Sequence, residues 1–192
     1  MAINYKKDVT KIQEKLKQKL SNSRYIHTLG VAYTASSLAM KYQVDVNSAC
    51  IAGLLHDCAK YMSGNEMLDK AKSFKIDISD SEYEKPDLLH AKLGSYFAEH
   101  KYNISDKDIL SAIRFHTTGK PDMSLLEKII YIADYIEPGR DKMPRLDIIR
   151  QVAFEDIDEC LKMILEDSLN YLRESGMKID TTTIDTYDFY CK

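Results

Sequence analysis

Apolar residues recur every three or four positions in one segment after another, and this spacing constrains the fold more than any other feature of the chain. From about Tyr5 to Leu20, for example, the inner apolar positions are Val9, Ile12 and Leu16. This spacing is typical of amphipathic α-helices, whereas strands alternate apolar and polar residues. Strand signals are weak, and only 7 glycines and 4 prolines interrupt the chain. The sequence therefore predicts an all-α fold.

Residues that can cap a helix stand at several of the expected helix starts. Ser63–Glu66 and Ser124–Glu127 have the spacing of a capping box, and Ser105–Asp108 approximates one. Pro138-Gly139 ends the helix that precedes it. The expected helices cover about 5–20, 23–42, 46–56, 64–73, 88–100, 106–116, 125–136, 146–153 and 156–174, and a loop covers about 74–87.

The length of 192 residues fits one domain. We expect a single helical bundle over residues 1–192, with its motifs within about 24–140 and a C-terminal helix and tail over about 155–192. Gly176 is a natural end for the last of these helices. The tail after it, MKIDTTTIDTYDFYCK, either docks on the body or extends from it.

Charge and composition exclude several classes of protein. A net charge of -3 and a pI of about 6.0 give no basic footprint for nucleic acid. No apolar stretch approaches the length of a membrane span or of a signal peptide, so we expect a cytoplasmic protein without membrane contact. The helices could form a homodimer, although no heptad seam is visible. We expect reduced thiols rather than a zinc cluster or disulfides at Cys50, Cys58, Cys160 and Cys191.

Histidines beside carboxylates are the candidates for chemistry, because this donor set binds zinc, iron or manganese. His27 lies on the inward face of its helix, and Arg24 precedes it by one turn. The adjacent pair His56-Asp57 ends an apolar run, and Asp134 interrupts another. A buried aspartate needs a metal or a strong donor. The alternatives are a core histidine satisfied by a hydrogen bond and aspartates on solvated faces.

Two more histidines, His90 and His116, stand at helix ends, where functional side chains are common. Arg140 follows the Pro-Gly break and is well placed for a phosphate, although it could be an ordinary surface residue. His100 has charged neighbours on both sides, so we expect it to face solvent.

The order of these residues resembles a known family. RYIHTLGV, AGLLHDCAK, LLHAKLGS, IRFHTTG and YIADYIEPGR contain the pattern His27, His56-Asp57, His90, His116 and Asp134. This pattern resembles the HD-domain superfamily of metal-dependent phosphohydrolases. It is most similar to the bacterial YqeK group, whose members split diadenosine tetraphosphate symmetrically into two ADP. The resemblance covers roughly Arg24 to Arg140 and leaves the role of the tail open.

The resemblance implies a single HD-domain helical bundle and a role for each matching residue. His27, His56, Asp57 and Asp134 would bind a divalent metal, with iron favoured and Mn, Co, Zn or Mg also open. The catalytic group would comprise Asp57, His90 and His116, in which both histidines face the phosphates or complete a second metal site bridged by Asp57. The expected phosphate or nucleotide contacts are Arg24, Lys60, His90, His116, Thr117 and Arg140.

Three functions remain open from the sequence. The first is symmetrical hydrolysis of diadenosine tetraphosphate, with a small nucleotide as the partner. The second is hydrolysis of another nucleotide by an HD enzyme: a nucleotidase, a dNTP triphosphohydrolase or a cyclic-nucleotide phosphodiesterase. The third is a metal-loaded, nucleotide-binding regulator without turnover.

Overall fold

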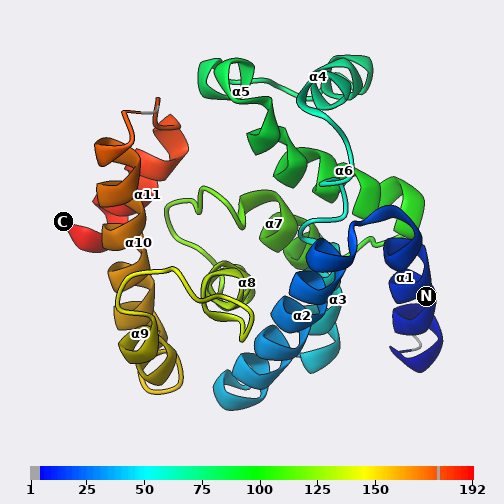
Figure 1. The fold of residues 1–192 in the computed structure, drawn as a ribbon. Helices are drawn as coiled ribbons and strands as arrows, with labels where there is room; N and C mark the ends of the chain where they lie inside the picture. Colours follow the sequence, from blue (N-terminus) through cyan, green and yellow to red (C-terminus); the bar gives the residue numbers. More distant parts are fainter. Residues whose placement is uncertain (1–4, 177) are drawn as a thin grey trace.

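The computed structural model describes residues 5–176 and 178–192, and every regular element within them is helical (Figure 1). This confirms the predicted all-α class. The elements, in chain order, are α1 (Tyr5–Lys19), α2 (Asn22–Tyr42), α3 (Val46–Leu55), α4 (Gly64–Ser73), α5 (Asp80–Glu84), the 3₁₀ turn η1 (Pro86–Leu89), α6 (His90–Tyr102), α7 (Lys107–Phe115), α8 (Leu125–Ile136), α9 (Leu146–Val152), α10 (Ile157–Glu174) and α11 (Thr181–Cys191).

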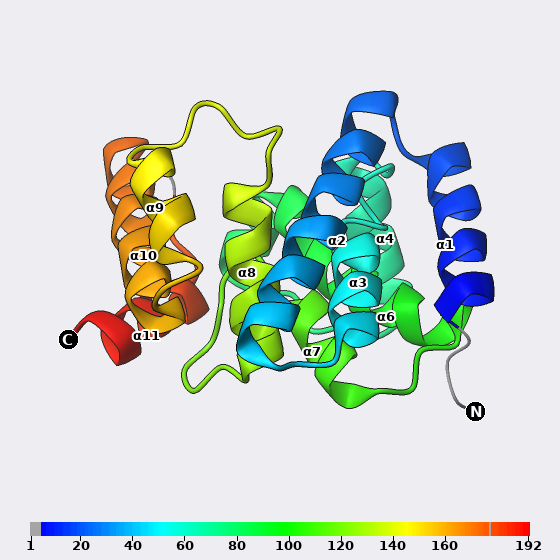
Figure 2. The ribbon, with the colours of Figure 1, turned by 90° about the horizontal axis from the view of Figure 1, so that it is seen from below.

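A central bundle lies between the N-terminal helix α1 and a group of C-terminal helices, and α4 and α5 pack on η1. In the bundle, α2 packs on α3 and α8, and α7 packs on α6 and α8. The N-terminal helix α1 flanks one side (Figures 1 and 2). On the opposite side, α10 packs on α8, α9 and α11. We call α9, α10 and α11 the C-terminal layer.

The junction of α2 and α3 explains how two distant chain segments deliver side chains to one point. Every residue from Ala49 to Leu55 is buried, so α3 is surrounded by protein. A Cβ atom at Gly53 would lie 2.7 Å from the Cα of Ala32. The missing side chain therefore lets the two helix backbones approach closely, and the end of α3 meets the face of α2 that carries His27.

The expected loop over about 74–87 is wrong in part, because it contains α5 and the start of η1. The side chain of Ser79 accepts a hydrogen bond from the backbone N–H of Glu82, and Glu82 returns one to the backbone of Ser79. This capping box gives α5 its start. Pro86 then stands in the first turn of η1, where a backbone N–H would have no partner within the helix, so that its absence in proline does no harm.

Two predicted helix starts also need correction. The Asp106 side chain, rather than Ser105, caps α7 by accepting from the backbone N–H groups of Asp108 and Ile109. The expected helix start near Leu88 is occupied by η1 instead, and α6 begins at His90.

The tail docks on the body rather than extending from it. Residues Thr181–Cys191 form α11, and the Asp180 side chain caps this helix. The Asp180 carboxylate also accepts hydrogen bonds from the hydroxyls of Ser79 and Ser81. The Tyr190 hydroxyl accepts a hydrogen bond from the backbone N–H of Met123 at 2.6 Å. Polar contacts at the two ends of α11 thus join the C-terminal layer to the start of α5 and to the segment before α8.

No disulfide joins the four cysteines, all of which lie within the described residues, in agreement with the expected thiols. Cys50, Cys58 and Cys160 are buried. Within residues 5–176 and 178–192, the structure contains no helix with the length and apolar character that a membrane crossing requires.

Candidate metal centre

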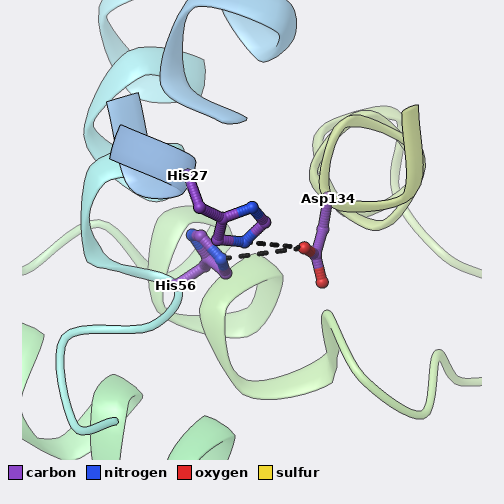
Figure 3. Close-up of side chains that lie close together, drawn as sticks. All are labelled: His27, His56 and Asp134. Carbon is purple, nitrogen blue, oxygen red and sulfur yellow. Dashed lines mark ion pairs between the residues drawn. The ribbon is translucent and has the colours of Figure 1, made fainter. Parts of the chain in front are cut away.

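Three helices bring the predicted metal ligands together. His27 projects from α2, His56 stands at the end of α3, and Asp134 projects from α8 (Figure 3). Nε2 of His27 lies 3.1 Å from Oδ1 of Asp134, and Nε2 of His56 lies 4.0 Å from the same oxygen. All three donor atoms therefore face one point, at spacings that a metal ion can bridge.

The carboxylate of Asp57 faces two pairs of histidines, one with each oxygen. Oδ2 lies 3.4 Å from Nε2 of His56 and 3.8 Å from Nε2 of His27. Oδ1 lies 3.3 Å from Nε2 of His90 and 3.7 Å from Nε2 of His116. The centre therefore has two lobes. The first contains His27 and His56, the second contains His90 and His116, and the Asp57 side chain belongs to both.

The backbone sets the tautomer of three of these histidines. His56, His90 and His116 each have Nδ1 within hydrogen-bond distance of the carbonyl oxygen three residues earlier, at 2.7, 2.5 and 2.7 Å. A carbonyl oxygen only accepts, so Nδ1 carries the proton and donates it. In the neutral ring, Nε2 then presents a lone pair to the centre, as a metal ligand must.

His27 obtains the same orientation from a side chain instead. It lies inside α2, and its Nδ1 donates to Oε1 of Glu137 at 3.1 Å. The other oxygen of Glu137 accepts from the backbone N–H of Gly139 at 2.7 Å. A Cβ atom at Gly30 would lie 2.4 Å from Oε2 of Glu137, so the absence of a side chain there makes room for this carboxylate.

Glu137 is a functional candidate that the sequence analysis missed. It is only 4% exposed, although it stands in a Pro-Gly segment that reads as a surface turn. The guanidinium of Arg150 donates to the carbonyls of Ile136, Glu137 and Arg140, at 2.9, 2.9 and 3.0 Å. Arg150 therefore holds the turn that carries Glu137. The sequence gives only a weak indication that Glu137 belongs to the site, which is that it follows Asp134 by three residues.

The donor set fits a divalent cation. Within the described residues, Nε2 of His27 and Nε2 of His56 are buried without a hydrogen-bond partner. Unsatisfied buried polar atoms are rare and call for a ligand or an ion. Burial opposes the charge of Asp57, yet the His56 and His116 imidazoles outweigh it and hold the pKa of Asp57 well below its ordinary value. The carboxylate is therefore ionised and ready to bind a cation.

The second lobe has the same need for positive charge. Nε2 of His90 and Nε2 of His116 lie 3.1 Å apart. Burial lowers the pKa of His90 to about 3, so this ring is neutral at pH 7. The Thr117 hydroxyl lies 3.3 and 3.2 Å from these two nitrogens, but its one proton can satisfy only one of them. The Nε2 lone pairs of His90 and His116 therefore need a proton or a cation between them.

Two arginines and a lysine border the centre. Nη1 of Arg24 lies 2.8 Å from Oδ2 of Asp57, and Nη2 of Arg140 lies 2.6 Å from Oδ1 of Asp134. Burial lowers the pKa of Lys60, which the charge of Asp57 partly restores. Both arginine side chains are about one-third exposed, so they can reach an anionic ligand from the surface.

The structure thus gathers every predicted site residue around one centre. The residue left out of the predicted site, His100, lies on α6 with its side chain 50% exposed. That agrees with the expected exposure.

Comparison with known proteins identifies the family. The model of the HD domain family matches residues 24–139. Two curated relatives carry the name symmetrical bis(5'-nucleosyl)-tetraphosphatase. The one from Bacillus subtilis is 38% identical over 91% of this chain and 92% of its own length. The one from Halalkalibacterium halodurans is 40% identical over 90% of this chain and 91% of its own.

A solved structure agrees with these relatives. It is a predicted HD superfamily hydrolase involved in NAD metabolism from Clostridium acetobutylicum, with a TM-score of 0.90 and 40% identity. The similarity covers 94% of this chain and 95% of that one. Since the matched segment contains the whole histidine–aspartate centre and the relatives extend over nearly the full chain, the chain belongs to the HD-domain family of metal-dependent phosphohydrolases.

Proposed function

We propose that this protein hydrolyses diadenosine tetraphosphate symmetrically into two ADP. The single observation that carries the proposal is the buried centre in which imidazole Nε2 atoms and the two aspartates converge. The substrate assignment is supported by the names of relatives that are 38% and 40% identical to this chain.

In this proposal, His27, His56, Asp57 and Asp134 hold one divalent ion. The unpartnered Nε2 atoms of His27 and His56 support the assignment. When bound, such an ion polarises phosphoryl oxygens and lowers the pKa of a coordinated water toward about 7. Iron is the metal that we favour, with Mn, Co, Zn and Mg as alternatives, and metal analysis of the purified protein distinguishes them.

His90 and His116 face the reacting phosphate or hold a second ion together with Oδ1 of Asp57. The 3.1 Å approach of their Nε2 atoms favours a cation in this lobe. Counting the ions bound per chain in wild-type protein and in the His90→Ala variant tests this point. One ion fewer in the variant supports a second site, and equal counts assign His90 to the phosphate.

The remaining polar residues bind and orient the phosphates. Arg24 and Arg140 contribute positive charge at the centre, one beside Asp57 and the other beside Asp134. Lys60 adds a third cation, and the Thr117 hydroxyl can donate to a phosphoryl oxygen. Phosphoryl transfer depends mainly on such in-line positioning and charge neutralisation.

Symmetrical cleavage requires water to attack one of the two inner phosphorus atoms. The bond between that atom and the central bridging oxygen breaks, the oxygen leaves with one ADP, and the water oxygen remains on the other ADP. Attack on an outer phosphorus atom would release AMP and ATP instead. The phosphate-binding cations must therefore place an inner phosphorus atom at the centre.

Product analysis on a nucleotide panel tests the proposal. Metal-replete protein should convert diadenosine tetraphosphate into ADP alone, and appreciable AMP or ATP would contradict the symmetrical cut. Faster turnover of a dNTP, a nucleoside monophosphate or a cyclic nucleotide would favour another HD-type activity. A protein that binds nucleotide but turns over none of the panel would be a regulator.

The proposal also covers the extent of the domain, the location of the protein in the cell and its oligomeric state. We treat residues 1–192 as one domain, because the C-terminal layer packs on α8 and joins α5 through Asp180. The cytoplasmic location and the homodimer stay predictions. Light scattering on the purified protein measures its oligomeric state directly.

A further inference from the structure

Both histidines of the second lobe stand at helix ends. His90 follows the 3₁₀ turn η1 and begins α6, and His116 follows the last residue of α7. His27, by contrast, lies inside α2. The 3.1 Å spacing between Nε2 of His90 and Nε2 of His116 therefore depends on how the segment before His90 and the segment after His116 are held.

One end of α11 is anchored to α5, the helix that precedes η1. The Asp180 carboxylate accepts a hydrogen bond from the Ser79 hydroxyl at 2.9 Å and another from the hydroxyl of Ser81, which is buried. Burial opposes the charge of Asp180, yet these bonds, that of Ser81 above all, hold its pKa below the ordinary value. Lys178 adds an ion pair with Glu84 at 2.9 Å. The start of α11 therefore fixes α5 through charged groups.

A series of short hydrogen-bonded turns leads from α5 to the ring of His90. The backbone N–H of Lys85 donates to the carbonyl of Ser81 at 2.8 Å, and that of Leu88 donates to the carbonyl of Lys85 at 3.1 Å. Nδ1 of His90 then donates to the carbonyl of Asp87. A displacement of α5 would therefore be passed on to His90.

The other half of α11 holds the segment 117–123, which directly follows His116. Thr186 is fully buried, and a Cβ atom at Gly119 would lie 2.6 Å from its Cγ2 atom, so α11 packs directly against the backbone of this segment. The backbone N–H of Met123 donates to the hydroxyl of Tyr190 at 2.6 Å. The N–H of Gly119 bonds back to the last residue of α7 at 2.8 Å, which joins the held segment to the helix that carries His116.

We propose that α11 is a brace that fixes the position of His90 relative to His116. It does so from a part of the chain beyond residue 139, where the match to the HD family model ends. Asp180 and Tyr190 are its positioning residues. The inference rests on the proposed function, because it concerns the second lobe of the same centre. The first lobe has other supports, since Glu137 orients His27 and a backbone carbonyl of α3 orients His56.

Asp180→Ser tests the anchor on α5. Serine is as good an N-cap as aspartate, so α11 keeps its start, but the shorter side chain cannot bridge to the two serines. Asp156→Ser is the matched control. Asp156 caps α10 by accepting from two backbone N–H groups at 3.0 Å, and it is exposed.

Tyr190→Phe tests the other anchor, because it removes the hydroxyl that binds Met123 and keeps the ring. Tyr33→Phe, at an exposed position on α2, is its control. Hydrogen exchange, measured by mass spectrometry on the metal-loaded proteins, should become faster over 79–90 in Asp180→Ser and over 117–123 in Tyr190→Phe. Exchange in α2 and α3 should match wild type in both.

The turnover of diadenosine tetraphosphate provides the functional measurement. Each of the two brace variants should lose about tenfold in kcat with little change in KM, because a small misplacement of groups at a reacting phosphate mainly slows the reaction. Both control variants should react like wild type. All rates are measured well below the melting temperature of each variant.

The double variant distinguishes a brace from two separate contacts. Asp180 and Tyr190 lie about 15 Å apart along α11, a separation at which independent effects add. A brace that has lost one anchor no longer fixes the two histidines, so the double variant should be little slower than either single variant. Additive losses in kcat, wild-type kcat in both single variants, or faster exchange throughout α2 and α3 would overturn the inference.

The same data separate this inference from the proposed function. If wild-type protein releases only ADP and both brace variants keep its kcat, the brace alone fails. If wild-type protein releases AMP and ATP while the variants show the expected exchange and the non-additive loss of rate, the symmetrical cut alone fails.

Discussion

Glu137 accepts a hydrogen bond from Nδ1 of His27 at 3.1 Å, and this contact directs Nε2 of His27 toward Asp134. Such a carboxylate fixes the ring orientation and raises the basicity of a metal-binding imidazole. His27 differs in this respect from the other three histidines of the centre, which use backbone carbonyls of their own segments. Its ligand geometry therefore depends on a side chain 110 residues away in the sequence.

Glu137→Gln should weaken metal binding by about 10- to 100-fold with little change in the fold. The carboxylate accepts from His27 with one oxygen and from the Gly139 N–H with the other, whereas an amide has only one acceptor oxygen for these two donors. Competition with a chelator of known affinity measures the change. Glu99→Gln, at an exposed position on α6, should bind metal like wild type. Equal affinities in the Glu137 and Glu99 variants would refute this role.

Gly30→Ala should reproduce the metal-binding defect of Glu137→Gln, because its Cβ would lie 2.4 Å from Oε2 of Glu137. The double variant should bind metal no more weakly than either single variant, since both disturb the same contact. Gly53→Ala provides a contrast, because its Cβ would lie 2.7 Å from a backbone atom of Ala32. We expect that variant to lose about 1–3 kcal/mol of unfolding free energy. Additive metal losses in the double variant would argue against the shared contact.

His56→Ala should remove most of the bound metal and nearly all hydrolysis, because it deletes a buried ligand that lies near both Asp57 and Asp134. His100→Ala should alter neither, since that side chain is half-exposed on α6. Elemental analysis and the rate of ADP release, measured on the same preparations, provide the comparison. Full metal content and rate in the His56 variant would rule out the proposed centre.

Metal-free protein should lose stability in mild acid because His90 is buried in its neutral form. Burial lowers the pKa of His90 to about 3, whereas a histidine in the unfolded chain has a pKa of about 6.5. Between these values the unfolded chain binds more protons, so the free energy of unfolding falls as the pH falls from about 6.5 toward 3. The slope for this group is at most about 1.4 kcal/mol per pH unit.

His90→Gln removes this contribution, so its stability should decline less between pH 7 and pH 5. Urea unfolding in the presence of a chelator gives the free energy of unfolding of the variant and of the wild type at each pH. Parallel declines in the variant and the wild type would show that His90 does not cause the loss.

The sequence predicted the fold and the ligand positions where local signals were strong. Helical spacing and capping boxes located most helices, and Ser124 with Glu127 forms the box expected at the start of α8. His56-Asp57 and Asp134 were recognisable because polar residues that adjoin apolar runs need a partner when they are buried. The family pattern then added His27, His90 and His116 to the same centre.

The remaining features depend on contacts between segments that are distant in the sequence. Glu137 lies in a Pro-Gly turn, and no local pattern indicates that Arg150 holds this turn against the bundle. The docking of the tail depends on Asp180 meeting two serines near α5, about 100 residues earlier. The close approach of Thr186 to Gly119 likewise forms only after the C-terminal layer packs on α8.

Removal and replacement of the metal tests the central claim most directly. The chelated protein should release no ADP from diadenosine tetraphosphate. Titration with ferrous iron should restore the rate until the ions bound per chain reach saturation, while Asp57→Asn should remain inactive at every metal concentration. A chelated, metal-free wild-type protein that releases ADP at the full rate would contradict the account.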